Sequence, residues 1–135
     1  MNPQPALSDL TKLVLKFRAE RDWEQFHTPK ELAISLIVEA AELLEIMQWR
    51  RDDDLARHLR RRKRAVADEL ADCLHSILLL ASDLSIDLAD AFIRKLKKTA
   101  RRYPACRYRG RPDKAPALSA GGRSPRRLKP ATGRA

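Results

Sequence analysis

Carboxylates spaced three residues apart stand inside two helix-favouring and otherwise apolar runs of the chain, residues 32–49 and 65–81. They are Glu39, Glu42 and Glu45 in the first run, and Glu69 and Asp72 in the second. Residues three apart share one face of an α-helix, so each run presents its carboxylates in a single direction. The flanking Leu, Ile, Val and Ala residues leave little polar face, so this direction is also that of the core.

Carboxylates that face one another inside a helical bundle repel strongly. Two like charges about 5 Å apart at an effective dielectric constant near 20 repel by roughly 3 kcal/mol, so four of them need protonation, ion pairs or a bound cation. Mg²⁺ prefers oxygen ligands and commonly binds carboxylates together with substrate phosphates. The spacing therefore predicts a metal cluster, and the alternative is that the acids are solvated on exposed helix faces.

The net charge of +10 is confined to the C-terminal part of the sequence. Residues 1–100 contain 17 Lys and Arg against 17 Asp and Glu, whereas residues 101–135 contain 11 basic residues and one acid. This last part is also rich in Pro, Gly, Ser and Ala, so we expect a disordered tail after about Ala115. We assign residues 1–110 to one folded domain and residues 111–135 to the basic tail. The tail has the charge to contact nucleic acid, although we do not favour that partner.

The sequence lacks the signals of a membrane or secreted protein. No apolar run is long enough to span a bilayer, and the N-terminus lacks the basic and then apolar pattern of a signal peptide. The two cysteines, Cys73 and Cys106, offer no disulfide framework. We therefore expect a cytoplasmic protein in a reducing compartment.

Apolar residues recur at helical spacing along the first hundred residues, and no strand pattern is present. This periodicity predicts four helices, which run from Ser8 to about Arg21, from Pro29 to about Trp49, from Asp52 to about Leu84 and from Asp87 to about Arg102. Ser8, Thr28 and Asp87 are the expected N-caps. The apolar faces are wider than one four-helix layer of this size can bury. The sequence therefore predicts an all-α, four-helix bundle that is completed by homo-oligomerisation, as a dimer or a tetramer.

Two segments have alternative interpretations that the sequence alone leaves open. Residues 22–27 contain Trp23, Phe26 and His27, which either form the wall of a binding pocket or pin the loop to the core. Residues 60–64 are five consecutive basic residues, which either form a solvated face or contact the acids of a partner subunit.

Several longer strings accompany the E-x-x-E and E-x-x-D pairs. They are RDWEQFHTPKEL from Arg21, EAAELLEIMQW from Glu39, ELADCL from Glu69 and RRYP from Arg101. With these strings the chain resembles the MazG-like nucleotide pyrophosphohydrolases, in particular their dCTP pyrophosphatase branch, over roughly residues 7–110. The resemblance implies a Mg²⁺-dependent enzyme of nucleotide-pool sanitation. Such an enzyme cleaves a nucleoside triphosphate, such as dCTP, between the α and β phosphates to the monophosphate and pyrophosphate.

The resemblance also implies roles for individual residues. Glu39, Glu42, Glu69 and Asp72 match the metal ligands of the family. Glu42 and Glu45 are the expected catalytic residues, and Glu45 matches a further acid of the same helix that would hold or orient the attacking water. The residues that match positions near the substrate are Trp23, Glu24, Gln25, Phe26, His27, Trp49, Ser76, Lys95 and Arg102.

Three positions depart from the dCTP pyrophosphatase branch. Val14 stands where the branch usually has His, Ser76 where it usually has Tyr, and Thr99 where it usually has Asn. None of them matches a metal ligand, so the implied hydrolysis is retained while the preferred base and sugar stay open. His75, beside Ser76, either contacts the nucleotide or is a satisfied core histidine.

Two functions from other classes are the alternatives. A non-catalytic helical oligomer would bind nucleic acid through its basic tail in a salt-sensitive manner. A metal-binding bundle without hydrolase activity, such as a carboxylate-bridged di-iron protein, usually contains Glu-x-x-His pairs, and neither acidic segment has one. We therefore prefer the hydrolase.

Overall fold

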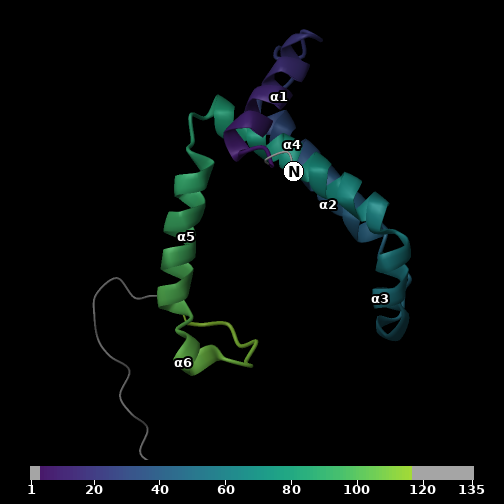
Figure 1. Cartoon of the computed structure of the whole chain (residues 1–135), viewed down its shortest axis with the longest axis vertical. Helices are drawn as coiled ribbons and strands as arrows, with labels where there is room; N and C mark the ends of the chain where they lie inside the picture. Colours follow the sequence, from purple (N-terminus) through teal and green to yellow (C-terminus); the bar gives the residue numbers. More distant parts are fainter. Residues whose placement is uncertain (1–3, 117–135) are drawn as a thin grey trace, which may run out of the picture. The chain divides into compact units, whose positions relative to one another are not determined.

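The structure is a computed structural model that describes residues 4–116 of the chain. Within those residues it contains six α-helices and no strand, so the predicted all-α class is confirmed (Figure 1). The helices are α1 (Leu7–Ala19), α2 (Pro29–Glu45), α3 (Asp52–Arg61), α4 (Lys63–Asp83), α5 (Leu88–Arg102) and α6 (Ala105–Tyr108). None of these helices is both long enough and apolar enough to cross a membrane. The tail beyond residue 116, on which the predicted disorder and nucleic-acid contact fall, lies outside the described residues.

The prediction of four helices is wrong, chiefly because the segment expected as one long helix from Asp52 divides at Arg62. The backbone of Arg62 leaves the helical region, with φ −100° and ψ 17°. Arg62 is the middle one of five consecutive cations, and like charges at neighbouring helical positions disfavour a continuous helix. The Nε2 atom of His58 also donates a hydrogen bond of 2.9 Å to the carbonyl oxygen of Ile46, which ties α3 to the residues just after α2. The short α6 is the other helix that the periodicity does not predict.

Two helix starts lie where capping side chains predict them. The hydroxyl group of Thr28 accepts a hydrogen bond of 3.3 Å from the backbone N–H of Glu31. The carboxylate of Asp87 accepts one of 2.9 Å from the N–H of Asp90. Each bond satisfies an N–H group that has no partner inside the helix, so these caps fix where α2 and α5 begin.

Two helix boundaries differ from the prediction. Ser8, the expected cap of the first helix, lies inside α1, because the carboxylate of Asp9 accepts a hydrogen bond of 3.3 Å from the N–H of Ala6 and starts the helix earlier. The second helix ends at Glu45 rather than at Trp49. Trp49 has a left-handed backbone with φ 62°, which an α-helix does not accommodate.

The chain divides into two compact units, residues 1–92 and 93–135. In the described part of the first unit, α2 and α4 pack side by side in opposite directions, and α1 and α3 each pack on α4 (Figure 1). The core side chains are Leu32 of α2 and Leu78 and Leu79 of α4, all almost fully buried. The central α4 therefore places its own acids opposite those of α2.

Many large apolar side chains of the first unit remain exposed. They are Leu13, Phe17, Trp23, Phe26, Ile34, Ile37, Val38, Leu44, Trp49, Leu70, Leu84, Ile86 and Phe92. Large apolar patches on a protein surface usually mark an interaction site. These side chains are the surface that the predicted homo-oligomer would cover, and the assembly itself stays a prediction.

The described part of the second unit folds back on itself after α6. The guanidinium group of Arg102 donates a hydrogen bond of 2.8 Å to the carbonyl oxygen of Ala115, and Ala115 is buried. The rings of Tyr103 and Tyr108 pack edge to face with their centroids 5.1 Å apart. The boundary predicted at residue 110 between a folded domain and a tail stays a prediction.

Candidate metal centre and active site

Three carboxylates from two helices converge on one point of the first unit. Glu39 of α2 and Glu69 and Asp72 of α4 each offer an oxygen atom, and these three atoms lie within 4.8 Å of one another. Glu39 and Glu69 are half-buried, and Asp72 is exposed. The i, i+3 spacing on α4 and the antiparallel packing of α2 against it produce this convergence, so three of the four predicted metal ligands lie together.

The acids of this cluster disfavour one another's charge. Burial raises the pKa of Glu39, and the nearby charges of Glu42, Asp72 and Glu69 raise it further. Burial also raises the pKa of Glu69, and Glu42, Asp72 and Asp68 add to the effect. Both pKa shifts mean that the folded chain holds negative charge here at a cost, which a bound cation would remove.

The donor set of the cluster fits a hard divalent cation. All three converging atoms are carboxylate oxygens, which are the ligands that Mg²⁺ and Ca²⁺ prefer, and no thiolate or imidazole is among them. The residues present therefore fit the predicted Mg²⁺.

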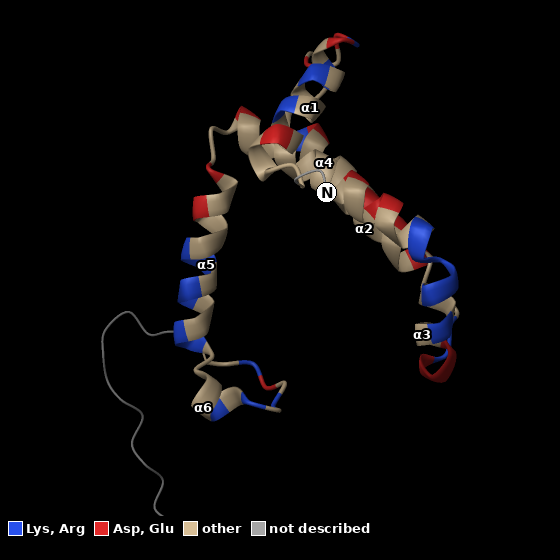
Figure 2. Cartoon of the chain, in the orientation of Figure 1, with Lys and Arg blue, Asp and Glu red and all other residues tan. Residues whose placement is uncertain are grey.

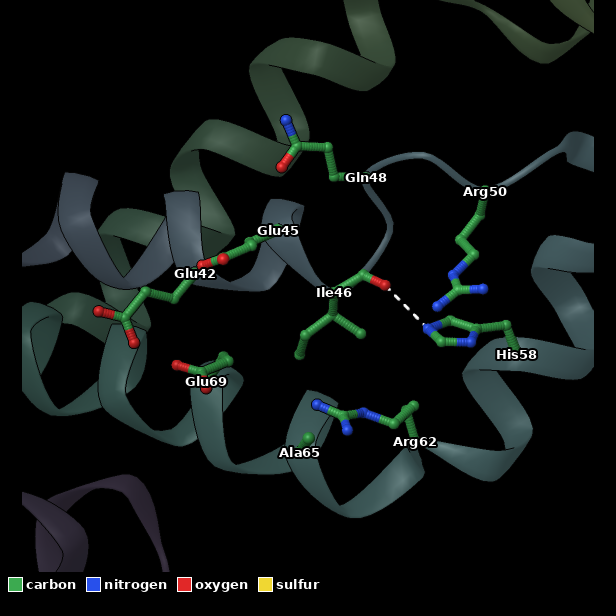
Figure 3. Close-up of a pocket in the computed structure, with 9 residues that line it drawn as sticks. All are labelled: Glu42, Glu45, Ile46, Gln48, Arg50, His58, Arg62, Ala65 and Glu69. Atoms are coloured by element: carbon green, nitrogen blue, oxygen red, sulfur yellow. Dashed lines mark hydrogen bonds between the residues drawn. The ribbon is translucent and has the colours of Figure 1, made fainter.

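A polar pocket of about 420 Å³ adjoins this acid cluster and shares Glu69 with it. The residues that line the pocket are Glu42, Glu45, Ile46, Gln48, Arg50, His58, Arg62, Ala65 and Glu69 (Figure 3). Glu42, the fourth predicted metal ligand, and Glu45, the predicted residue for the attacking water, are therefore both on its wall. Figure 2 shows acidic residues on α2 and α4 and basic residues where α3 meets α4, so the pocket lies between opposite charges.

An aromatic group lies near Asp72 of the acid cluster. The ring of Phe17 packs edge to face on both Trp23 and His75, with centroid distances of 5.9 Å in each case. The ring of His27 lies 5.7 Å from that of Trp23. Burial lowers the pKa of His75 and His27 lowers it further, while the charge of Asp72 opposes the shift. The electrostatic contact with Asp72 places the aromatic group next to the carboxylates.

Residues 34–111, more than half of the chain, match the MazG-like family. The chain belongs to the MazG-like family. Similar curated proteins include human dCTP pyrophosphatase 1, which is 40% identical over 106 residues, or 77% of this chain and 62% of the relative. The mouse dCTP pyrophosphatase 1 is 37% identical over 116 residues, or 79% of this chain and 68% of the relative. This MazG-like chain thus spans roughly two thirds of the length of these relatives.

A solved structure agrees with this assignment. A pyrophosphatase from Archaeoglobus fulgidus superposes with a TM-score of 0.70 and 40% sequence identity, over 77% of this chain and 97% of that one. The resemblance drawn from the sequence is therefore confirmed, as is the prediction that the chain belongs to a family of nucleoside triphosphate pyrophosphatases.

The loop that carries Trp23 is anchored in this MazG-like chain by a long-range ion pair. The guanidinium group of Arg18 donates two hydrogen bonds of 2.8 Å to the carboxylate of Asp83, at the end of α4. The carbonyl oxygen of Arg18 accepts the backbone N–H of Trp23 at 3.2 Å. Trp23 in turn accepts the backbone N–H of His27 at 3.0 Å. The Arg18–Asp83 pair therefore positions the aromatic loop on α4.

The other predicted residues of this loop are engaged locally or are exposed. Glu24 lies 3.8 Å from Arg18. The side chain of Gln25 donates a hydrogen bond of 2.8 Å to the carboxylate of Asp22. Phe26 is exposed. Of the predicted loop residues, Trp23 and His27 are thus the two that join the aromatic group.

The remaining predicted substrate contacts lie apart from the pocket or in the second unit. Trp49 is 91% exposed, does not line the pocket and has a left-handed backbone. Ser76 is only 5% exposed within the packing of α4. Lys95 and Arg102 belong to the second unit, where Lys95 is exposed and Arg102 bonds to Ala115. Their roles stay predictions.

The basic side of the pocket is not among the predictions from the sequence. Arg50, His58 and Arg62 line it, whereas the sequence predicts only a solvated face or a contact with a partner subunit for the basic run. A usable signal was present, since Arg62 lies seven residues before Glu69 and thus two helical turns away on a similar face.

Proposed function

We propose that this MazG-like chain is a Mg²⁺-dependent nucleoside triphosphate pyrophosphohydrolase. It converts a pyrimidine deoxynucleoside triphosphate such as dCTP to the monophosphate and pyrophosphate and so serves nucleotide-pool sanitation. The observation that carries the proposal is the convergence of Glu39, Glu69 and Asp72 beside a polar pocket. The relatives named dCTP pyrophosphatase 1 support the reaction and the choice of base.

The carboxylates have two different roles in the proposed reaction. Glu39, Glu69 and Asp72, with Glu42 beside them, would hold Mg²⁺, which would neutralise phosphate charge and lower the pKa of water at the site. Glu45 lies on the pocket wall one turn from Glu42, where it orients the attacking water and accepts its proton. The water oxygen bonds to the α-phosphorus, the bond from that phosphorus to the bridging oxygen breaks, and pyrophosphate leaves with the electron pair. Positioning and charge stabilisation suffice for this reaction, so no covalent intermediate is required.

The aromatic group supplies the nucleoside side of the site. The indole of Trp23 is partly exposed, so its face is available to stack on a base. The Nδ1 atom of His27 is buried and has no hydrogen-bond partner among the described residues. A buried polar atom of this kind favours a polar partner, and a group on the base or sugar fits that need.

The exposed apolar surface supports a homo-oligomer. Single chains rarely expose so many large apolar side chains together, and a second copy of the chain with the same surface would cover them. Trp49 is one of them, and in an assembly its indole is available to the site of another copy. Cys73 and Cys106 are free thiols, which fits the cytoplasmic location that we propose.

The direct test is a screen for pyrophosphate release from the canonical dNTPs and NTPs and from modified pyrimidine dNTPs, each with Mg²⁺ and with EDTA. We expect release that requires Mg²⁺ and is fastest with a pyrimidine deoxynucleotide. Release of orthophosphate instead of pyrophosphate, or equal rates with EDTA, would refute the proposal. The matched variants Glu42→Gln and Asp72→Asn should abolish release while the circular dichroism spectrum stays unchanged.

A further inference from the structure

The pocket beside the acid cluster has a basic wall that the mechanism above does not use. Figure 3 shows the carboxylates of Glu42, Glu45 and Glu69 on one side of the pocket and the side chains of Arg50, His58 and Arg62 on the other. The basic residues come from three separate segments: the loop after α2, the helix α3 and the bend between α3 and α4. Their convergence on one cavity is therefore a product of the fold.

Local structure fixes this basic wall. The imidazole of His58 is held by its 2.9 Å hydrogen bond to the carbonyl oxygen of Ile46, which itself lines the pocket. The non-helical backbone of Arg62 breaks the helix at the point where its side chain reaches the cavity. In Figure 3 the guanidinium group of Arg62 extends along the pocket from the bend towards the acidic side.

The two arginines that line the pocket differ from the neighbouring arginines in their ion pairs. Arg51 lies 3.4 Å from Asp53, and Arg57 lies 2.6 Å from Asp54, so these two cations are compensated locally. Among residues 4–116, no carboxylate forms an ion pair within 4.0 Å of Arg50 or Arg62. After Arg57, the charge of Arg50 also lowers the pKa of Asp54, so Arg50 interacts with that carboxylate without forming a contact ion pair. A wall of cations that form no contact ion pair and face a cluster of acids suits a ligand that carries both a divalent cation and several negative charges.

We propose that Arg50 and Arg62, with His58 beside them, form a binding subsite for the β- and γ-phosphates of the triphosphate. The inference rests on the proposed function and extends it, because it assigns the leaving pyrophosphate to a specific wall of the first unit. Guanidinium groups bind phosphate oxygens through paired, charge-assisted hydrogen bonds, which makes arginine well suited to this task. The pocket volume of about 420 Å³ lies within the range of small-molecule sites.

The test measures the binding of inorganic tripolyphosphate and of orthophosphate to the full chain by titration calorimetry, with Mg²⁺ present. Arg62→Gln and Arg50→Gln should each weaken tripolyphosphate binding by at least about tenfold, because each removes a hydrogen-bonding partner of a charged group. Orthophosphate fills one phosphate position rather than two, so its binding should weaken by a smaller factor in the same variants. Arg62→Lys, which keeps the charge but loses the paired geometry, should give an intermediate loss.

Arg60→Gln is the matched control, since Arg60 belongs to the same basic run but does not line the pocket. It should leave tripolyphosphate binding within about twofold of the original value. Equal losses of tripolyphosphate affinity in Arg60→Gln and Arg62→Gln would mean that only the overall positive charge of the segment matters, and they would overturn the subsite. A chain that does not bind tripolyphosphate would overturn it as well. A chain that binds tripolyphosphate with this pattern but hydrolyses no nucleotide would keep the subsite and refute the proposed reaction alone.

Discussion

The ion pair between Arg18 and Asp83 is predicted to carry a large share of the stability of the first unit. The side chain of Arg18 is 5% exposed and that of Asp83 is 22% exposed, and two hydrogen bonds of 2.8 Å join them. The hydrogen bond and the charge of Asp83 raise the pKa of Arg18, so the guanidinium group is charged. Asp83→Ala leaves this buried cation without its partner.

The expected loss follows from the burial of the pair. Removing one member of a buried ion pair typically costs about 3–5 kcal/mol, and the partly exposed edge of Asp83 places the loss near the lower end, at about 3 kcal/mol. Glu24 lies 3.8 Å from Arg18 but is largely exposed, so it offsets little of this loss. With a urea m-value of about 2 kcal/mol/M, the unfolding midpoint should fall by about 1.5 M.

The assay is urea unfolding followed by circular dichroism, at one fixed protein concentration because the proposed assembly would make stability depend on concentration. The matched control is Asp54→Ala, which removes the partner of Arg57 from a surface pair in which two guanidinium nitrogens donate to one carboxylate oxygen. Since both of those side chains are exposed, its loss should stay below about 1 kcal/mol. Equal losses in Asp83→Ala and Asp54→Ala would show that burial does not set the strength of the pair, and they would refute the reasoning.

Three further predictions concern the site and the assembly. Without metal, the raised pKa of Glu39 should make Glu39→Gln more stable than the unmodified chain at neutral pH. Thermal unfolding should show this advantage shrinking as the pH falls through the raised pKa, because Glu39 then becomes protonated in the folded chain. The advantage should vanish near pH 4.5, the ordinary pKa of a glutamate carboxyl. An advantage that grows on acidification would contradict the shift. Trp23→Ala should raise KM by about tenfold with a smaller effect on kcat in steady-state kinetics, because it removes a stacking surface, and an unchanged KM would exclude that role. Ile37→Glu, on the exposed apolar surface, should reduce the mass measured by light scattering to that of the single chain, whereas an unchanged mass would place the interface elsewhere.

The parts of the site that the sequence predicts are those set by local periodicity. Glu69 and Asp72 share a face because they are three residues apart on one helix, and that relation needs no tertiary information. Glu39 joins them because the two long helices α2 and α4 pack side by side. The caps Thr28 and Asp87 are likewise local, since each bonds to an N–H three residues on.

The parts that the sequence does not predict depend on distant contacts or on unusual backbone. Arg18 and Asp83 are 65 residues apart, and nothing in their local sequence pairs them. Trp49 adopts a positive φ that disfavours any residue with a side chain, so its position could not be inferred from helical spacing. The hydrogen bond of His58 joins α3 to Ile46, twelve residues earlier, and the bend at Arg62 places the side chain of Arg62 on the pocket wall, so neither relation can be inferred from local periodicity.

The measurement that most directly tests the central claim is Mg²⁺ binding to the full chain by titration calorimetry. The unmodified chain should bind Mg²⁺, and Glu69→Gln should weaken that binding by at least tenfold, because Glu69 contributes an oxygen to the convergent cluster. Glu31→Gln, in the first turn of the same α2 that carries Glu39, should bind Mg²⁺ like the unmodified chain. Equal affinities in the unmodified chain and in Glu69→Gln would contradict the assignment of a metal centre to these carboxylates.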